Sequence, residues 1–296
     1  MSSTKPLLPS QSIKYFKRGK LHFFALVLLS GFAFLFPFKS FSQGNLLVTP
    51  RRVVFEGDRR TFDLNLANTG QDTATYAISM VQIRMNDDGS FENITEPDPD
   101  QHFADKNIRY FPRSVTLPPN EAQVVKVQLR NANMLEPGEY RSHFYFRSVP
   151  KLVALGEEET EVDTTALTIR ITPVFGITIP AIIRIGESHT TVTLSDLALD
   201  IAKDGPPSLS LKFNRTGNFS VYGDLKVDHI SPQGKVTKVG AANGIAVYTP
   251  NLTRQFKFSL YDVPEVDFSS GKLLIEFSSS SDVRLEKYAK SELVLQ

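Results

Sequence analysis

Apolar and polar residues alternate with a period of two along most of the chain after Asn45. In an extended backbone successive side chains point to opposite faces, so this alternation predicts β-strands that each bury one face. The clearest runs are residues 62–66, 76–80, 125–129, 209–213, 221–227, 256–260 and 273–277. A chain with this pattern has to bury its apolar faces by packing one sheet against another.

Turn-forming residues separate these runs at short intervals, among them Asn68-Thr69-Gly70, Glu136-Pro137-Gly138 and Ser231-Pro232-Gln233-Gly234. Many short strands joined by such turns predict β-sandwiches. We therefore expect an all-β fold with two sandwiches in tandem, because about 250 residues exceed the size of one sandwich. The one helix candidate in the pattern, residues 284–293, competes with a final strand, which we favour.

The change from the first sandwich to the second is expected near Pro180 and Ala181, where the proline would stiffen a turn. The segment 151–165 lies before this point and contains Gly156-Glu157-Glu158-Glu159, which predicts an acidic surface loop. The predicted organisation is a targeting segment over residues 1–42, a first domain over 43–180 and a second domain over 181–296.

The first 42 residues have the pattern of a cleavable export signal. Basic residues at positions 14–20 precede an apolar run from Leu21 to Phe38, and Ser40-Phe41-Ser42 places small residues at a cleavage site before Gln43. An uncleaved membrane anchor is the alternative, because the apolar run matches the length of a spanning helix, about 17–25 residues. Pro37 favours cleavage, since proline breaks a helix. Once the signal is removed, we expect no integral membrane segment.

The charge balance excludes some partners. The chain carries 33 basic and 32 acidic residues, and without the bases of residues 1–42 it carries 27 basic residues against 32 acidic ones. A slightly acidic chain offers no basic surface for nucleic acid, so we expect no nucleic-acid partner. There is no cysteine, so the stability of an exported chain has to come from its packed cores.

The sequence gives little support for catalysis. The histidines are scattered, at His22, His102, His143, His189 and His229, and no nucleophile elbow, cysteine nucleophile or glycine-rich phosphate loop is present. Oxygen and imidazole ligands are close together in the segment 96–102, but its two prolines favour a solvated loop over a metal site. We therefore expect no enzyme activity, no metal and no cofactor.

Four segments, taken in chain order, resemble the periplasmic chaperones of the chaperone–usher pilus pathway, the PapD-like family. The segments are residues 48–57, in which Arg52 precedes a short apolar stretch, residues 62–68, residues 111–127 and residues 139–150. The resemblance covers most of residues 46–150 and continues weakly through residues 214–218. It implies two immunoglobulin-like sandwiches, a periplasmic location and a role in the assembly of surface fibres.

The resemblance also implies a mechanism and partners. Pilus or fimbrial subunits of that pathway lack a strand, and the chaperone lends one, which covers an apolar groove that would otherwise aggregate. The matching donor strand in this sequence carries Leu167, Ile169 and Ile171 on one face. An outer-membrane usher is a further partner that the resemblance suggests, as is self-association through the donor edge.

Arg52 is the candidate anchor for the terminal carboxylate of the client. In the family a first-strand arginine and a lysine on the donor strand hold this carboxylate, and a guanidinium suits the task because its planar donors reach both oxygens. The expected lysine is missing between Ile171 and Pro180. Arg170 is the nearest base and is the candidate replacement.

Two alternatives remain open. The strand with Leu167, Ile169 and Ile171 could be an ordinary core strand of the first sandwich, and Arg52 could be a solvated edge charge. The chain would then be an exported structural or adhesive module that binds a partner through its loops. Exposure of Leu167, Ile169 and Ile171 at a sheet edge would favour the chaperone hypothesis, and their burial within the first sandwich would favour the module.

Overall fold

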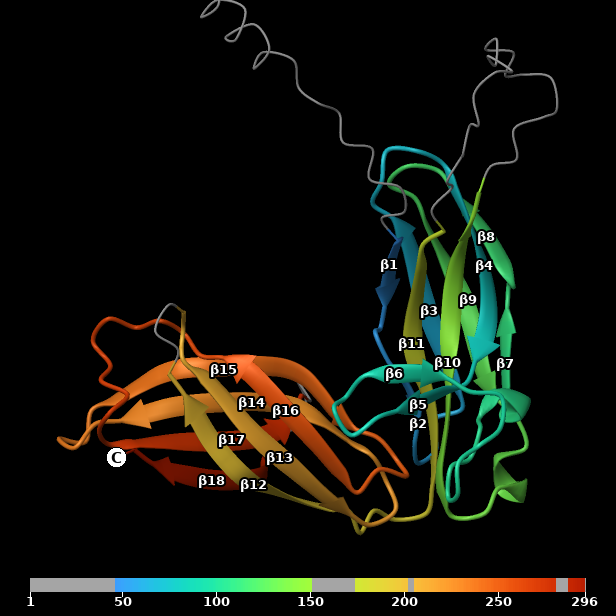
Figure 1. The fold of residues 1–296 in the computed structure, drawn as a ribbon. Helices are drawn as coiled ribbons and strands as arrows, with labels where there is room; N and C mark the ends of the chain where they lie inside the picture. The colour runs from blue at the N-terminus through green and yellow to red at the C-terminus, as the bar shows by residue number, and fades with distance from the viewer. Residues whose placement is uncertain (1–45, 151–173, 202–204, 281–286, 296) are drawn as a thin grey trace, which may run out of the picture. The chain divides into compact units, whose positions relative to one another are not determined.

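The computed structural model of the 296-residue chain describes residues 46–150, 174–201, 205–280 and 287–295. All of them belong to one compact unit, Gln43–Gln296. Within these residues the regular structure consists of β-strands and two short 3₁₀ helices, η1 (Asp105–Asn107) and η2 (Ala132–Met134). The all-β fold of two immunoglobulin-like sandwiches is confirmed (Figure 1).

The first sandwich consists of a four-stranded and a five-stranded sheet (Figure 1). The first sheet has the order β1 (Leu46–Thr49), β3 (Thr61–Asn68), β9 (Ala122–Leu129), β7 (Ile108–Phe111). The second has the order β2 (Val53–Phe55), β11 (Gly176–Ile185), β10 (Gly138–Val149), β4 (Ala74–Val81), β8 (Ser114–Leu117). The predicted alternation produces this packing: every second residue of β3 is buried, starting from Phe62.

Aromatic side chains join the two sheets of the first sandwich. Phe55 packs edge-on against Phe62, and Tyr110 packs in the same way against Phe144, with ring centroids 5.1 and 5.2 Å apart. These geometries add to the burial of apolar area, which supplies most of the stability of such a core. The Tyr110 hydroxyl donates a hydrogen bond to the Ile78 carbonyl, so this buried polar group is satisfied.

The N-terminal strand divides between the two sheets. β1 pairs antiparallel with β3, and after Pro50 the chain crosses to the other sheet, where β2 pairs with β11. The pairing of β2 with β11 is parallel and covers only Ala181, Ile182 and Ile183 of β11. β2 is therefore a short edge strand that leaves the start of β11 uncovered.

The second sandwich consists of a three-stranded and a four-stranded sheet. Its sheets have the orders β12 (Thr191–Asp200), β13 (Ser208–Thr216), β16 (Thr253–Ser259), and β15 (Val236–Val247), β14 (Val221–Ile230), β17 (Lys272–Ser279), β18 (Lys287–Val294). Phe213 and Phe277 meet in its core with ring centroids 5.0 Å apart. The favoured final strand is confirmed as β18.

A separate hairpin joins β5 (Ile83–Met85) to β6 (Phe91–Asn93). Its turn includes Gly89, whose φ of +84° lies in the left-handed region that glycine adopts without steric cost. The Gln255 amide donates a hydrogen bond to the Asp87 carbonyl at 2.6 Å, which ties the turn to β16.

The predicted domain boundary needs a correction. β11 continues without a break through Pro180 and Ala181 to Ile185, and it remains paired with β10 over its whole length. The next strand, β12, begins at Thr191, so residues 186–190 join the two sandwiches. Proline is tolerated inside β11 because β11 has no second strand partner at that position among the described residues.

The predicted export signal lies outside the described residues. In the part of the chain that the structure describes, no helix has the length and apolar character needed to cross a bilayer.

Candidate functional site

The start of β11 is an open sheet edge. β10 pairs with β11 along its whole length, but β2 covers the other edge only from Ala181 onward. Among the described strands, none pairs with the second edge of β11 from Gly176 to Pro180. The two residues just before this edge, Val174 and Phe175, are about half exposed. An unpaired edge with exposed apolar residues is a place where another strand can add.

Arg52 lies at the end of this open edge. Val53, the first residue of β2, is aligned with Ala181 in the parallel pairing, so Arg52 comes just before β2 and beside the last residue of the uncovered part of β11. Its guanidinium stacks 3.8 Å from the ring centroid of Tyr222, and it lies 5.8 Å from that of Tyr248. The Nη1 atom of Arg52 is buried and has no hydrogen-bond partner. A buried donor without an acceptor is costly, and an incoming anion would satisfy it.

Two further side chains with unpaired polar atoms lie near Arg52. Arg141 and His143 are two residues apart on β10, so their side chains share a face of the strand, and both are almost completely buried. The Arg141 guanidinium lies 4.1 Å from the Tyr248 ring centroid, and its Nη2 atom donates to the Thr249 carbonyl at 3.1 Å. Its Nε and Nη1 atoms, and Nδ1 of His143, have no partner.

The electrostatics of the site favour an anion. Burial lowers the pKa of the Arg141 guanidinium, and the positive charge of Arg52 lowers it further. Burial, followed by the charges of Arg141 and Arg52, lowers the pKa of His143 to about 3, so this imidazole is neutral at ordinary pH. The unpaired N–H groups of two neighbouring guanidinium groups are donors of the kind that a carboxylate or a similar anion accepts from.

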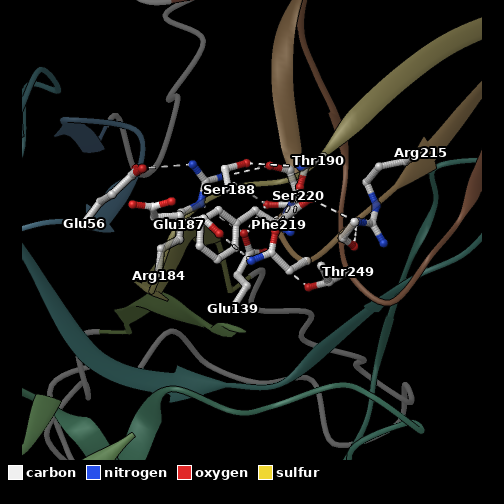
Figure 2. Close-up of polar contacts among 12 residues, drawn as sticks. Glu56, Glu139, Arg184, Glu187, Ser188, Thr190, Arg215, Phe219, Ser220 and Thr249 are labelled. Atoms are coloured by element: carbon white, nitrogen blue, oxygen red, sulfur yellow. Dashed lines mark hydrogen bonds and ion pairs between the residues drawn. The ribbon is translucent and has the colours of Figure 1, made fainter. Parts of the chain in front are cut away.

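The buried carboxylate of Glu139 already accepts hydrogen bonds from other residues. Its carboxylate accepts hydrogen bonds from the amide and the hydroxyl of Ser220, at 2.9 and 2.7 Å, and from the Thr249 hydroxyl at 3.2 Å (Figure 2). Arg184 donates to it at 3.2 Å and also donates to the Ser220 carbonyl. Glu139 raises the pKa of Arg141 through space, but its hydrogen bonds go to these other groups.

The sequence-based candidates have different outcomes. Arg52 lies in the buried site just described, whereas its neighbour Arg51 is exposed. The predicted donor residues Leu167, Ile169 and Ile171, and the predicted second anchor Arg170, lie outside the described residues. Their roles remain predictions.

Sequence reasoning missed Arg141 and His143. Both belong to the run Glu139-x-Arg141-x-His143, in which polar residues alternate with Tyr140 and Ser142. Such a run is typical of a solvent-exposed strand face, and the sequence contains no sign that this face is covered. The signal that could have found them is the length of β10, because a long central strand rarely exposes a whole face.

The metal candidate in residues 96–102 finds no support in the described part of the chain. Asp98 is held by Arg84, whose Nε atom donates to it at 2.7 Å, and the Arg84 guanidinium lowers the pKa of this carboxyl. Among the residues that the structure describes, no group of three histidine, aspartate or glutamate side chains could hold a metal ion.

Comparisons with known proteins give similarities in fold. No family model and no curated protein matches the sequence. Among solved structures, the chain is similar to the class 5 fimbriae chaperone CfaA, with 15% identity, a TM-score of 0.39, and coverage of 85% of this chain and 99% of that chain. It is similar to the Pseudomonas aeruginosa CupB2 chaperone, with 14% identity, a TM-score of 0.43 and coverage of 84% and 100%.

A third similar structure is the Salmonella enterica SafA pilin in complex with the SafB chaperone, with 15% identity, a TM-score of 0.41 and coverage of 85% and 96%. At these identities the likeness concerns the fold alone. In its fold, the chain is similar to the chaperones of the chaperone–usher pilus pathway.

Proposed function

We propose that this chain is a non-enzymatic chaperone that binds incomplete β-sandwich subunits of pili or related surface fibres, in the periplasm. The observation that carries the proposal is the open edge of β11, Gly176–Pro180, with the unpaired guanidinium of Arg52 at its end. A client strand can add to this edge through main-chain hydrogen bonds, which need no particular client sequence. No nucleotide is required, because the donor strand of this chain covers the client's groove directly.

We also infer a direction for the client strand. β2 occupies the edge of β11 from Ala181 onward, so a client strand on the preceding residues has to stop at Arg52. Arg52 carries a positive charge, so the client end that it favours is the negatively charged carboxyl end. A strand whose carboxyl end lies beside Pro180 runs in the same direction as β11. The proposed pairing of client and β11 is therefore parallel.

Two cations are proposed to hold the client carboxylate. Arg52 Nη1 and the Nε and Nη1 atoms of Arg141 are the unpaired donors of the described site. Arg170 remains the second anchor proposed from the sequence, and Arg141 is a candidate that only the structure suggests. Charge-assisted hydrogen bonds in a buried site are stronger than those on a surface, so this anchor would fix the register of the client strand.

The donor residues Leu167, Ile169 and Ile171 complete the proposal. They precede the open edge in the chain, so a strand through them would extend β11 in the direction of its start. Their apolar side chains would fill pockets in the groove of the client.

Co-expression with candidate fibre subunits tests the donor strand. The unaltered chain should keep a client soluble in a one-to-one complex, and Ile169→Asp should lose it, because an unpaired charge is costly in an apolar pocket. Thr168→Asp is the matched control, since it places the same charge on the opposite face of the strand. Equal client recovery with both variants would contradict donation and would favour the structural or adhesive module.

Substitution of Arg52 tests the anchor. We expect Arg52→Ala to weaken client binding about 10- to 100-fold, the effect of losing hydrogen bonds to a charged group. Arg51→Ala is the matched control, because Arg51 is exposed and lies next to Arg52 in the sequence. Circular dichroism would establish that both variants fold. Equal affinities of folded Arg52→Ala and Arg51→Ala for the client would refute the anchor.

A further inference from the structure

A cavity of about 260 Å³ lies beside the cationic site. Its apolar lining includes Ile83, Met85 and Phe91 of the β5–β6 hairpin, Ala246 near the end of β15, and Tyr248, which follows β15. Its polar lining includes His143 and Arg254. The volume is below that of pockets for drug-sized ligands, about 300–1,000 Å³, and so suits a single side chain.

Two residues that line the cavity lie next to the anchor. Tyr248 lines the cavity, and its ring also contacts the guanidinium of Arg141 at 4.1 Å. His143 lines the cavity as well, and its ring centroid lies 6.3 Å from that of Tyr248. A carboxylate held by Arg52 and Arg141 would therefore have the cavity next to it.

The chemistry of the cavity favours an aromatic occupant. Met85, Ala246 and Tyr248 form a buried apolar cluster with Ile182. The Phe91 ring is 57% exposed and lies 6.3 Å from the ring centroids of both His143 and Tyr248. Aromatic rings at such separations can take a further ring in an edge-to-face arrangement.

Arg254 adds a cation to the same cavity. Its Nη1 atom donates to the Ala246 carbonyl at 2.6 Å, but its Nε atom is buried and has no partner. A guanidinium with an incomplete set of partners attracts the face of an aromatic ring. His143 is neutral, because its pKa is lowered to about 3, and so it does not repel an apolar group.

We propose that this cavity, lined by Met85, Phe91, Ala246, Tyr248 and Arg254, holds the aromatic side chain of the client's last residue. The inference rests on the proposed function, since it requires that the client's terminal carboxylate is bound by Arg52 and Arg141. The cavity then selects clients by their final residue, whereas main-chain pairing along β11 accepts any sequence.

Synthetic peptides test the proposal. The probes are twelve-residue peptides of alternating valine and threonine that end in phenylalanine, alanine or aspartate, each with a free carboxylate, and a phenylalanine-ended peptide with a terminal amide. Fluorescence anisotropy would measure their binding to the purified chain. Burial of a large aromatic side chain should favour the phenylalanine-ended acid over the alanine-ended acid about tenfold.

Two variants locate the preference in the cavity. Phe91→Ala removes the exposed ring, and Ala246→Leu fills the space, so both should bring the phenylalanine-to-alanine affinity ratio close to one. Phe111→Ala is the matched control, because Phe111 is exposed on β7, outside the cavity lining, and it should keep the tenfold ratio. An unchanged ratio in folded Phe91→Ala would overturn the assignment to this cavity.

The outcomes separate the two proposals. If all three acids bind equally and more tightly than the amide, the aromatic subsite is wrong and the carboxylate anchor stands. If the amide binds as tightly as the corresponding acid, the anchor is wrong, and the subsite as defined here fails with it. If none of the peptides binds, both proposals are refuted.

Discussion

The buried imidazole of His143 makes the stability of the fold depend on pH. Its pKa is lowered from 6.5 to about 3 in the folded chain by burial and by the charges of Arg141 and Arg52. As the pH falls below 6.5, the unfolded chain binds a proton at this residue, and the folded chain does so only near pH 3. Protonation therefore favours the unfolded state, and stability is lost as the pH falls from 6.5 toward 3.

The size of this effect follows from the two pKa values. Each pH unit between them changes the free energy of unfolding by about 1.4 kcal/mol, so the interval from pH 6.5 to 5 costs about 2 kcal/mol. A variant without an ionisable group at this position, His143→Gln, avoids this part of the loss. We expect His143→Gln to be less stable than the unaltered chain at pH 7, because it disturbs packing, and to lose about 2 kcal/mol less between pH 7 and 5.

Urea denaturation followed by circular dichroism measures the two free energies of unfolding. The difference between the proteins at a single pH includes the packing cost of the substitution, and this cost cancels when two pH values are compared. Between pH 7 and 8.5 the difference should stay constant, because neither state binds a proton at His143 there. A difference that is the same at pH 5 and pH 7 would refute the reasoning, since it would mean that the folded chain protonates His143 as readily as the unfolded chain.

Three further substitutions test contacts that organise the described unit, each by urea denaturation. Glu139→Ala should lower the free energy of unfolding by about 3–5 kcal/mol, because it removes a buried carboxylate that accepts four hydrogen bonds and leaves its donors unpaired. A loss below about 1 kcal/mol would contradict this role of Glu139. Asn68→Ala should lower the free energy of unfolding by about 1–3 kcal/mol. The buried side-chain amide of Asn68 donates to the Asp72 and Leu117 carbonyls and accepts from the Gly70 amide. An unchanged denaturation midpoint would show that water replaces these hydrogen bonds. Gly217→Ala should lower the free energy of unfolding by about 1–3 kcal/mol, because φ of Gly217 is +87° and the new Cβ would lie 2.6 Å from the His189 carbonyl oxygen. An unchanged free energy of unfolding would refute the predicted strain.

The strands were predictable because their signal is local. Alternation along residues 62–66, 125–129 and 209–213 indicated which side chains share a buried face, and β3, β9 and β13 bury those side chains. Turn residues between the runs predicted short connections. The domain boundary was not predictable from Pro180, because a proline fits both in a turn and in a strand edge that lacks a partner.

The sequence by itself determined the all-β class and the strand faces, since each depends on residue types within a few positions of one another. Arg52 was predicted from the resemblance, and its role as an anchor stays a prediction. Only the tertiary structure decided that β2 covers β11 from Ala181 onward, that no described strand pairs with the edge before it, and that Arg141 and His143 are buried near Arg52. The physical reason is that pairing partners and the neutralisation of charge involve residues far apart in the chain. A strand's alternation identifies the residues on one face, whereas the groups that cover this face come from elsewhere in the chain.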